Sequence, residues 1–296
     1  MFSINQKRNE VLTRLGVADI LDITNEFELV YRITDQLYCF AESATPESYL
    51  AILSAETTGI TPNDELIELG ITICAYSPVD MKIIRIVNAQ RFFEEPSKTI
   101  HPEATKRHGH TAESLEGMRF PDEAIQALFT HSNCNFIIAH NAKFVRKYIE
   151  KRFTFLHDLS LKWTSLCHDV DWNNNGCYST SLNDLAKHFG FSFEQRNTIA
   201  SNAAVAIILS EAPDSFKKII TALSKLTYRI YAFHAPFEVK DQLSLRGFEW
   251  DPLAGVWHKD LSDEDKEDEL EFIYSLYFGA DETVSIRVID AENRYQ

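Results

Sequence analysis

The sequence predicts an α/β fold, a mixed β-sheet flanked by helices, followed by a small α+β module. The first observation is a succession of three strand-like apolar segments, Tyr49–Leu53, Leu66–Tyr76 and Ile83–Phe93. The second is a further short buried strand, Phe136–Ala139, set between helical segments. The third is a change of pattern near Pro213, where a second module begins. Three antiparallel strands, a helix and a further strand between helices indicate a mixed sheet that carries helices.

Local signals place the turns and helices of this first domain, to which we assign residues 46–212. Ser77-Pro-Val-Asp80 is typical of a hairpin turn between the second and third strands. Pro121 suits the first turn of a helix, and Gly190 marks the end of another. Apolar periodicity predicts helices over Thr111–Glu116, Pro121–Thr130, Ala142–Phe153, Ser181–Phe189 and Ile199–Leu209.

Residues 1–45 are predicted to form an N-terminal adaptor segment. Gln6–Leu15 has helical periodicity, and Phe27–Ile33 has the pattern of a short helix or strand. Ala44–Ser48 contains a proline and is predicted to be a loop that leads into the first strand.

Residues 213–296 are predicted to form a small α+β module. Trp250 and Trp257 lie at hairpin spacing, and we expect both to belong to the core of this module. The acidic run that starts at Asp263 is typical of a solvated helix face, and a protein partner could bind through this module. The expected elements, in order, are Phe216–Leu226 (helix), Tyr228–Phe233 (strand), Val239–Leu245 (helix), Phe248–Trp250 with Val256–Lys259 (hairpin), Asp263–Phe278 (helix) and Thr283–Ile289 (strand).

Composition narrows the classes of function. The chain has 296 residues, of which 45% are hydrophobic and 25% charged, as in ordinary globular proteins. We expect no membrane span and no secretory signal, because no apolar run is long enough and the first residues lack an apolar segment. Five dispersed cysteines predict reduced thiols in a cytoplasmic protein. A net charge of −15 disfavours non-specific coating of duplex DNA but permits a local groove for a strand end.

Three short motifs occur in order along the first domain. Ser54-Ala-Glu56-Thr-Thr-Gly59, at the end of the first strand, resembles the Asp-x-Glu-Thr-Thr-Gly motif of proofreading exonucleases. His108-Gly-His-Thr111, followed by Phe120-Pro121, resembles their His-Gly-Ile-Thr segment. Ile138-Ala-His-Asn-Ala-Lys-Phe-Val145 resembles their second motif, Ala-His-Asn-Ala-x-Phe-Asp. The order, spacing and structural context of the three matches together indicate the family of DEDDh 3′→5′ exonucleases.

The likeness continues downstream, over about residues 25–290. Segments within 163–172, 182–190 and 232–257 resemble a bacterial subgroup described as DNA polymerase III epsilon-like. The resemblance implies an RNase H-like fold, with a mixed five-stranded sheet flanked by helices, and the small appended module. It also implies a mechanism of phosphodiester hydrolysis in which four acids hold two Mg²⁺ or Mn²⁺ ions and a histidine is the general base.

At the positions that match the catalytic residues, this sequence departs from the family. Ser54 replaces the first Asp, Glu56 remains, and Val145 replaces the Asp of the second motif. In the third motif, Arg196 aligns with the His and Ser201 with the Asp, and a shift of one residue would instead place Asn197 and Asn202 there. Neither register restores an acid or a base. Because one carboxylate cannot hold two divalent ions, we expect no metal site and no catalysis by the family mechanism.

We therefore predict a catalytically degenerate exonuclease-like protein, a pseudoenzyme that binds single-stranded nucleic-acid ends or nucleotides weakly, or acts as a scaffold. The alternatives are a phosphodiesterase that uses Glu56 with one Mg²⁺ or Mn²⁺ ion, and a protein–protein interaction module. No cofactor is expected outside the one-metal alternative. The candidate binding residues are Glu56, Thr57, Thr58, His140, Asn141 and Arg196. A charge-compensating cation is expected beside the lone Glu56, and the candidate is Arg196 or, failing that, a nearby Lys. The basic residues near the motifs are Arg91, Lys106, Arg107, Lys143, Arg146 and Lys147.

Overall fold

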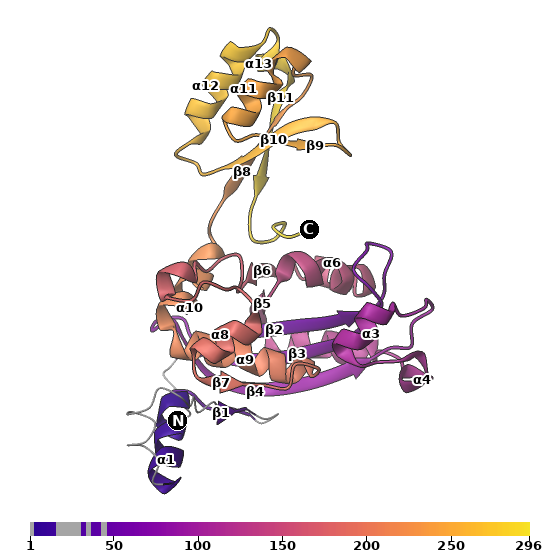
Figure 1. The fold of residues 1–296 in the computed structure, drawn as a ribbon, viewed down its shortest axis with the longest axis vertical. Coiled ribbons are helices and arrows are strands. Elements are labelled where there is room, and N and C mark those ends of the chain that lie inside the picture. The colour runs from indigo at the N-terminus through magenta and orange to yellow at the C-terminus, as the bar shows by residue number, and fades with distance from the viewer. Residues whose placement is uncertain (1–2, 16–30, 34–36, 43–45) are drawn as a thin grey trace. The chain divides into compact units, whose positions relative to one another are not determined.

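The structure is a computed structural model of the chain and describes residues 3–15, 31–33, 37–42 and 46–296. The chain divides into two compact units (Figure 1). The larger unit comprises Met1–Ala222 with Tyr295–Gln296, and the smaller unit comprises Leu223–Arg294. Within the described ranges, no helix combines the length and the apolar character that crossing a bilayer requires.

The larger unit is built on the mixed five-stranded sheet that the family resemblance implies. Its strand order is β4-β3-β2-β5-β6, in which β2, β3 and β4 are antiparallel neighbours and β5 and β6 run parallel to β2. Every residue of the second strand in this order is buried, as expected for a sheet covered on both faces. The strands are β2 (Ser48–Thr57), β3 (Leu66–Ser77), β4 (Lys82–Phe93), β5 (Cys134–Ala139) and β6 (Lys162–Ser165). This arrangement is the expected RNase H-like fold.

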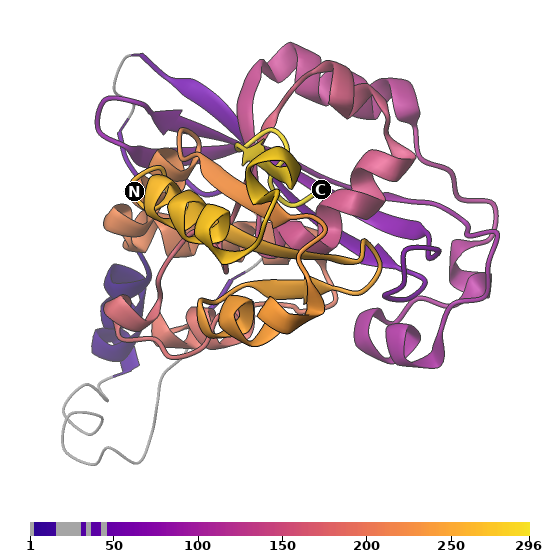
Figure 2. The same cartoon turned by 90° about the horizontal axis from the view of Figure 1, so that it is seen from above.

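Helices cover both faces of this sheet (Figure 2). Helix α9 (Thr198–Glu211) packs on β2, β3 and β4, and α6 (Ala142–Arg152) packs on the opposite face. Gly70 lets the first turn of α9 approach the sheet, because a Cβ atom there would lie 2.5 Å from the Thr198 side chain. The other helices of this unit are α1 (Ile4–Leu15), α3 (Pro102–His108), α4 (Ala112–Leu115), α5 (Asp122–Ser132), α7 (Phe155–Asp158), α8 (Leu182–His188), α10 (Pro213–Ala222) and the 3-10 turn η1 (Asn173–Asn175).

The described part of the N-terminal segment packs as part of the larger unit. The predicted helix forms as α1, in which the backbone N–H of Ile4 donates to Glu211 Oε1 at 2.9 Å. Of the predicted element at Phe27–Ile33, residues 27–30 lie outside the described residues, and Tyr31–Arg32 form β1, which pairs with β7 (Phe191–Ser192). The predicted loop at residues 44–48 lies partly outside the described residues.

From β8 onward the smaller unit contains the expected helices and strands in the expected order, whereas the predicted helix Phe216–Leu226 forms as α10 in the larger unit. Its sheet is antiparallel with strand order β11-β8-β10-β9, and its helices follow β8 and β10, which is a βαββαβ arrangement. Its hydrophobic core contains Ile230, Leu243 and Ile273. The elements are β8 (Thr227–Ala232), η2 (Phe237–Val239), α11 (Lys240–Leu245), β9 (Glu249–Asp251), β10 (Val256–Leu261), α12 (Lys266–Leu276), α13 (Ala280–Thr283) and β11 (Val284–Ile289).

Two details of this module differ from expectation. The boundary lies at Leu223 and not at residue 213, because α10 packs against β4, β6 and α9 and buries Phe216 completely in the larger unit. Trp257 packs against the core of the module as expected, whereas Trp250 is 49% exposed because β9 is an edge strand. The two indole rings lie 5.6 Å apart.

Candidate functional site

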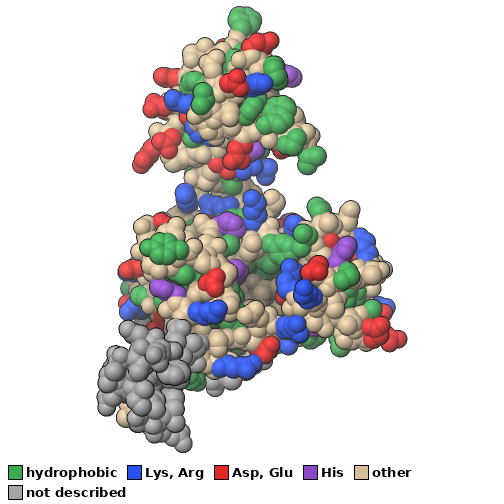
Figure 3. Space-filling model, in the orientation of Figure 1, with side chains coloured by type: hydrophobic (Ala, Val, Ile, Leu, Met, Phe, Trp, Pro, Cys, Tyr) green, Lys and Arg blue, Asp and Glu red, His purple; other side chains and the backbone are tan. Residues whose placement is uncertain are grey.

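A cleft opens where β2 ends, beside the first residues of α6. Because β2 and β5 run parallel, both strands end at the same edge of the sheet, and the residues that follow them meet there. The cleft has a volume of about 600 Å³ and is lined by Leu53, Ser54, Ala55, Glu56, Ile60, Arg107, His140, Asn141, Phe144, Val145, Leu182 and Ser201. Figure 3 shows the larger unit hollowed, with Lys and Arg side chains beside the hollow.

The structure brings together all four positions that match the acids of the resembled family. Ser54, Glu56, Val145 and Ser201 line the same cleft although they lie far apart in the sequence. Of the two registers left open for the third motif, the first places Ser201 in the cleft, while Asn202 lies almost fully buried beneath it.

Ser54 and Asn202 form a neutral pair at the base of the cleft. Ser54 Oγ lies 2.8 Å from Asn202 Oδ1 and 2.9 Å from the Thr198 carbonyl, either of which accepts its proton. The Asn202 amide donates to the carbonyls of Ile52 and Gly70, so it bridges two strands of the sheet. These contacts satisfy buried polar groups without any charge.

Glu56 is the one carboxylate among the described residues that line this cleft. Its side chain is 19% exposed, and Arg107 Nη2 lies 3.6 Å from its Oε2 atom. Burial raises the pKa of Glu56 to about 7, even though the charge of Arg107 opposes the shift, and the neighbouring Glu68 carboxylate adds to it. The cleft therefore holds a carboxyl group that titrates near neutral pH.

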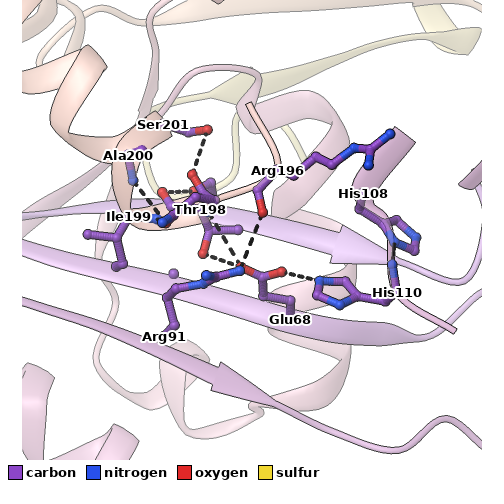
Figure 4. A network of polar contacts seen from close by, with 12 residues as sticks. Glu68, Arg91, His108, His110, Arg196, Thr198, Ile199, Ala200 and Ser201 are labelled. Carbon is purple, nitrogen blue, oxygen red and sulfur yellow. Dashed lines mark hydrogen bonds and ion pairs between the residues drawn. The ribbon is translucent and has the colours of Figure 1, made fainter. Parts of the chain in front are cut away.

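A second carboxylate, Glu68, was not among the predicted site residues and lies directly opposite Glu56 in the β2–β3 register. Glu68 is fully buried and its oxygens are occupied (Figure 4). Arg91 Nε and Thr198 Oγ1 donate to Oε1 at 2.9 and 2.6 Å, and His110 Nε2 lies 2.5 Å from Oε2. Burial opposes ionisation, but the hydrogen bonds from His110 and Thr198 and the charge of Arg91 hold the pKa of Glu68 below its usual value.

Arg196 is not the cation beside Glu56, so that expectation is wrong. Its Nη2 atom donates to the Lys106 carbonyl at 3.1 Å, and its own carbonyl accepts from Arg91. The reason is local, since the last turn of α3 leaves backbone carbonyls without partners inside the helix, and the Arg196 guanidinium satisfies one of them. Arg107 takes the expected place beside Glu56.

The other candidate binding residues divide into two groups. Thr57 and Thr58 are fully buried and do not line the cleft, because their hydroxyls donate to the Gly59 carbonyl and to Asp64 Oδ1. His140 and Asn141 do line it. Asn141 caps α6 by accepting from the Phe144 N–H, and His140 Nε2 lies 2.7 Å from the Thr180 carbonyl. Burial lowers the pKa of His140, which favours the neutral ring.

The donors in the cleft do not fit a two-metal centre. Two hard divalent cations require several carboxylate oxygens, and the cleft offers those of Glu56, whose neighbour Glu68 is fully engaged by Arg91, His110 and Thr198. Ser201 Oγ donates to the Asn197 carbonyl, and Val145 has no polar atom in its side chain. Among the described residues, no cluster of three or more His, Cys, Asp or Glu side chains is arranged to hold a metal ion.

The raised pKa of Glu56 predicts a pH-dependent cost in stability. The folded pKa is about 7 and the ordinary value is 4.5, so between these values the folded state binds more protons than the unfolded state. Stability must then fall as pH rises through this window, by about 3 kcal/mol in all. Glu56→Gln should lack this loss in urea denaturation at pH 4.5 and pH 8.

An exposed glutamate provides the control for this prediction. Glu123→Gln, on the solvent side of α5, should keep the pH dependence of the unsubstituted protein. If Glu56→Gln and Glu123→Gln give the same pH dependence, Glu56 does not have the raised pKa.

Comparisons with known proteins agree with the motifs. Residues 52–197 match the model of the family described as Exonuclease (RNase_T). Over 152 residues the chain is 28% identical to a PolC-type DNA polymerase III of Mycoplasmopsis pulmonis (strain UAB CTIP). That match covers 51% of this chain but 9% of the polymerase, so the chain spans a small part of that relative's length.

Two solved structures illustrate the structural likeness. One is the zinc-bound complex of E. coli exonuclease I with single-stranded DNA, with a TM-score of 0.46 at 16% identity, covering 61% of this chain and 48% of that one. The other is the nuclease domain of 3′hExo bound to rAMP, with a TM-score of 0.42 at 12% identity, covering 59% of this chain and 94% of that one.

Proposed function

We propose that the chain, whose residues 52–197 match the Exonuclease (RNase_T) family model, is a catalytically degenerate member of the DEDDh exonucleases that binds a nucleic-acid end or a nucleotide without hydrolysing it. The observation that carries the proposal is the donor set of the cleft. Where the family has four acids, this cleft has Glu56 beside Arg107, together with Ser54, Val145 and Ser201. An arginine beside a carboxyl group that protonates near neutral pH favours an anion over a divalent cation.

The chemistry of the cleft suits the terminal nucleotide of a strand. Arg107 has a half-exposed guanidinium that can donate two parallel hydrogen bonds to a phosphate. Phe144 and Leu182 offer apolar surface against which a base can stack or pack. Arg107 is the one Lys or Arg among the described residues that line this cleft, so the proposal for the cleft concerns the terminal nucleotide of a strand and not a long tract.

The proposal includes no cofactor and a cytoplasmic location. All five cysteines are free thiols, three of them buried, which supports a reducing compartment.

Binding of AMP in the presence of EDTA tests the proposal. The protein should bind AMP without metal, and Arg107→Glu should weaken binding by about tenfold or more, because the phosphate loses its charged donor. Arg196→Glu makes the same charge change outside the cleft lining and should leave AMP binding unchanged. If AMP does not bind, or if both variants bind as well as the unsubstituted protein, the cleft is not a nucleotide site.

The pH dependence of the same binding provides a second readout. As pH falls from 8 to 6, protonation of Glu56 removes a negative charge beside Arg107. AMP affinity should then improve by about fivefold, roughly 1 kcal/mol, relative to Glu56→Gln. The comparison with this variant removes the contribution of the phosphate's own titration.

A further inference from the structure

One face of the smaller unit's sheet carries aromatic and arginine side chains and no helix of that unit. Side chains alternate along β8, so Ile230 and Ala232 point into the core with α11 and α12. Arg229 and Tyr231 therefore point to the other face, and the register places His258 opposite Tyr231 and Arg287 opposite Arg229. Phe233 follows β8 directly, and its ring lies on the same face, stacked on that of Tyr231. We call Arg229, Tyr231, Phe233, His258 and Arg287 the aromatic face.

The rings of the aromatic face lie next to one another and are partly exposed. Tyr231 and Phe233 stack with their centroids 5.7 Å apart at an interplanar angle of 27°, and His258 lies 6.2 Å from Tyr231. Phe233 is 37% exposed, and Tyr231 and His258 are partly exposed. Part of this aromatic surface therefore remains in contact with solvent, where a planar partner could cover it.

The two arginines beside these rings differ in whether an acidic side chain compensates them. Arg287 and Arg229 lie directly opposite each other on neighbouring strands, an arrangement that is destabilising unless an anion compensates it. Asp260 compensates Arg229 through two hydrogen bonds of 2.6 and 2.7 Å. Arg287 is exposed and forms no ion pair with any residue that the structure describes. Acids lie on both sides of this sheet: in the first turn of α12, and on the aromatic face itself, where the register places Glu249 opposite His258 and Asp260 opposite Arg229.

We propose that the aromatic face binds single-stranded nucleic acid, with bases stacked on Tyr231 and Phe233 and a phosphate bound by Arg287. Four-stranded sheets that present aromatic side chains on an open face are a common platform for unpaired bases, because every base has a flat apolar face. A phosphate would compensate Arg287 as Asp260 already compensates Arg229. This site lies in the smaller unit and does not depend on the cleft.

Fluorescence anisotropy of the full chain with fluorescein-labelled ten-nucleotide dT and U oligomers, in EDTA at 50 mM salt, tests the proposal. Tyr231→Ala with Phe233→Ala should weaken binding by about tenfold or more. Arg287→Glu should also weaken binding and reduce its dependence on salt, because one phosphate contact is lost. Tyr274→Ala removes an exposed ring from α12 and serves as the matched control, which should bind as the unsubstituted chain does.

Two further variants separate folding and the cleft from the aromatic face. Tyr231→Phe keeps the ring and should retain binding. If a variant loses binding because it is unfolded, its thermal unfolding transition will also be lowered. Arg107→Glu, in the cleft, should leave oligomer binding largely intact even where it abolishes AMP binding. The proposal is overturned if the unsubstituted chain does not bind the oligomers, if Arg287→Glu binds equally well, or if Arg107→Glu alone abolishes binding. Capture of a protein on this face without oligomer binding would also overturn it.

Discussion

Replacing Glu68 with alanine should lower the free energy of unfolding of the larger unit by about 3–5 kcal/mol, because it leaves the partners of a fully buried carboxylate unpaired. Arg91, His110 and Thr198 all donate to this carboxylate, which joins β3 and β4 to the segment after α3 and to the first turn of α9 (Figure 4). Thermal and urea denaturation of the full chain measure the effect, and the transition of the larger unit should shift.

An exposed ion pair provides the control for Glu68. Glu194 pairs with Arg32 at 2.7 Å, but both side chains are at least half exposed, so Glu194→Ala should cost less than about 1 kcal/mol. The two carboxylates of the β2–β3 pair also differ in the sign of their pH dependence. Because the pKa of Glu68 is lowered, Glu68 contributes to stability at pH values above the pKa that it has in the unfolded chain, and this contribution is lost on acidification. The contribution of Glu56 has the opposite sign and is lost as pH rises. Equal costs for Glu68→Ala and Glu194→Ala would contradict the buried network.

The second large effect concerns catalysis. With single-stranded DNA or RNA and millimolar Mg²⁺ or Mn²⁺, the purified chain should release no nucleotides above a buffer blank. The reason is the donor set, since Ser54, Val145 and Ser201 provide no carboxylate and Arg196 provides no base. Glu56→Ala should be equally inactive. Metal-dependent digestion that disappears in Glu56→Ala would instead support the one-metal alternative.

Much of the fold was predictable from local patterns. Apolar runs located β2, β3, β4 and β5 of the larger sheet but not the short strand β6, and the first and second motifs fall at strand ends where their side chains meet. Helix α3 was not predicted, because Pro102–His108 is short and polar, with two buried residues. Its position could not be read from the sequence, so neither could the proximity of Arg107 to Glu56.

The errors at the site have one physical origin, because side-chain partners depend on register and on helix ends. Glu68 lies within an apolar strand, and only the β2–β3 register shows that it faces Glu56. Arg196 was expected beside Glu56, but the carbonyls at the end of α3 lie closer to it. Pro213 marked a boundary in the sequence, yet Phe216 and Ile219 of α10 are fully buried within the larger unit.

The central claim is that Arg107 beside a single carboxyl group, and not a pair of metal ions, determines what the cleft binds. The most direct measurement is the electron density of crystals soaked with MnCl₂ and AMP, collected at a wavelength where manganese scatters anomalously. We predict AMP density with its phosphate within hydrogen-bond distance of Arg107 and no manganese peak at Glu56. One or two manganese peaks coordinated by Glu56 would contradict this claim.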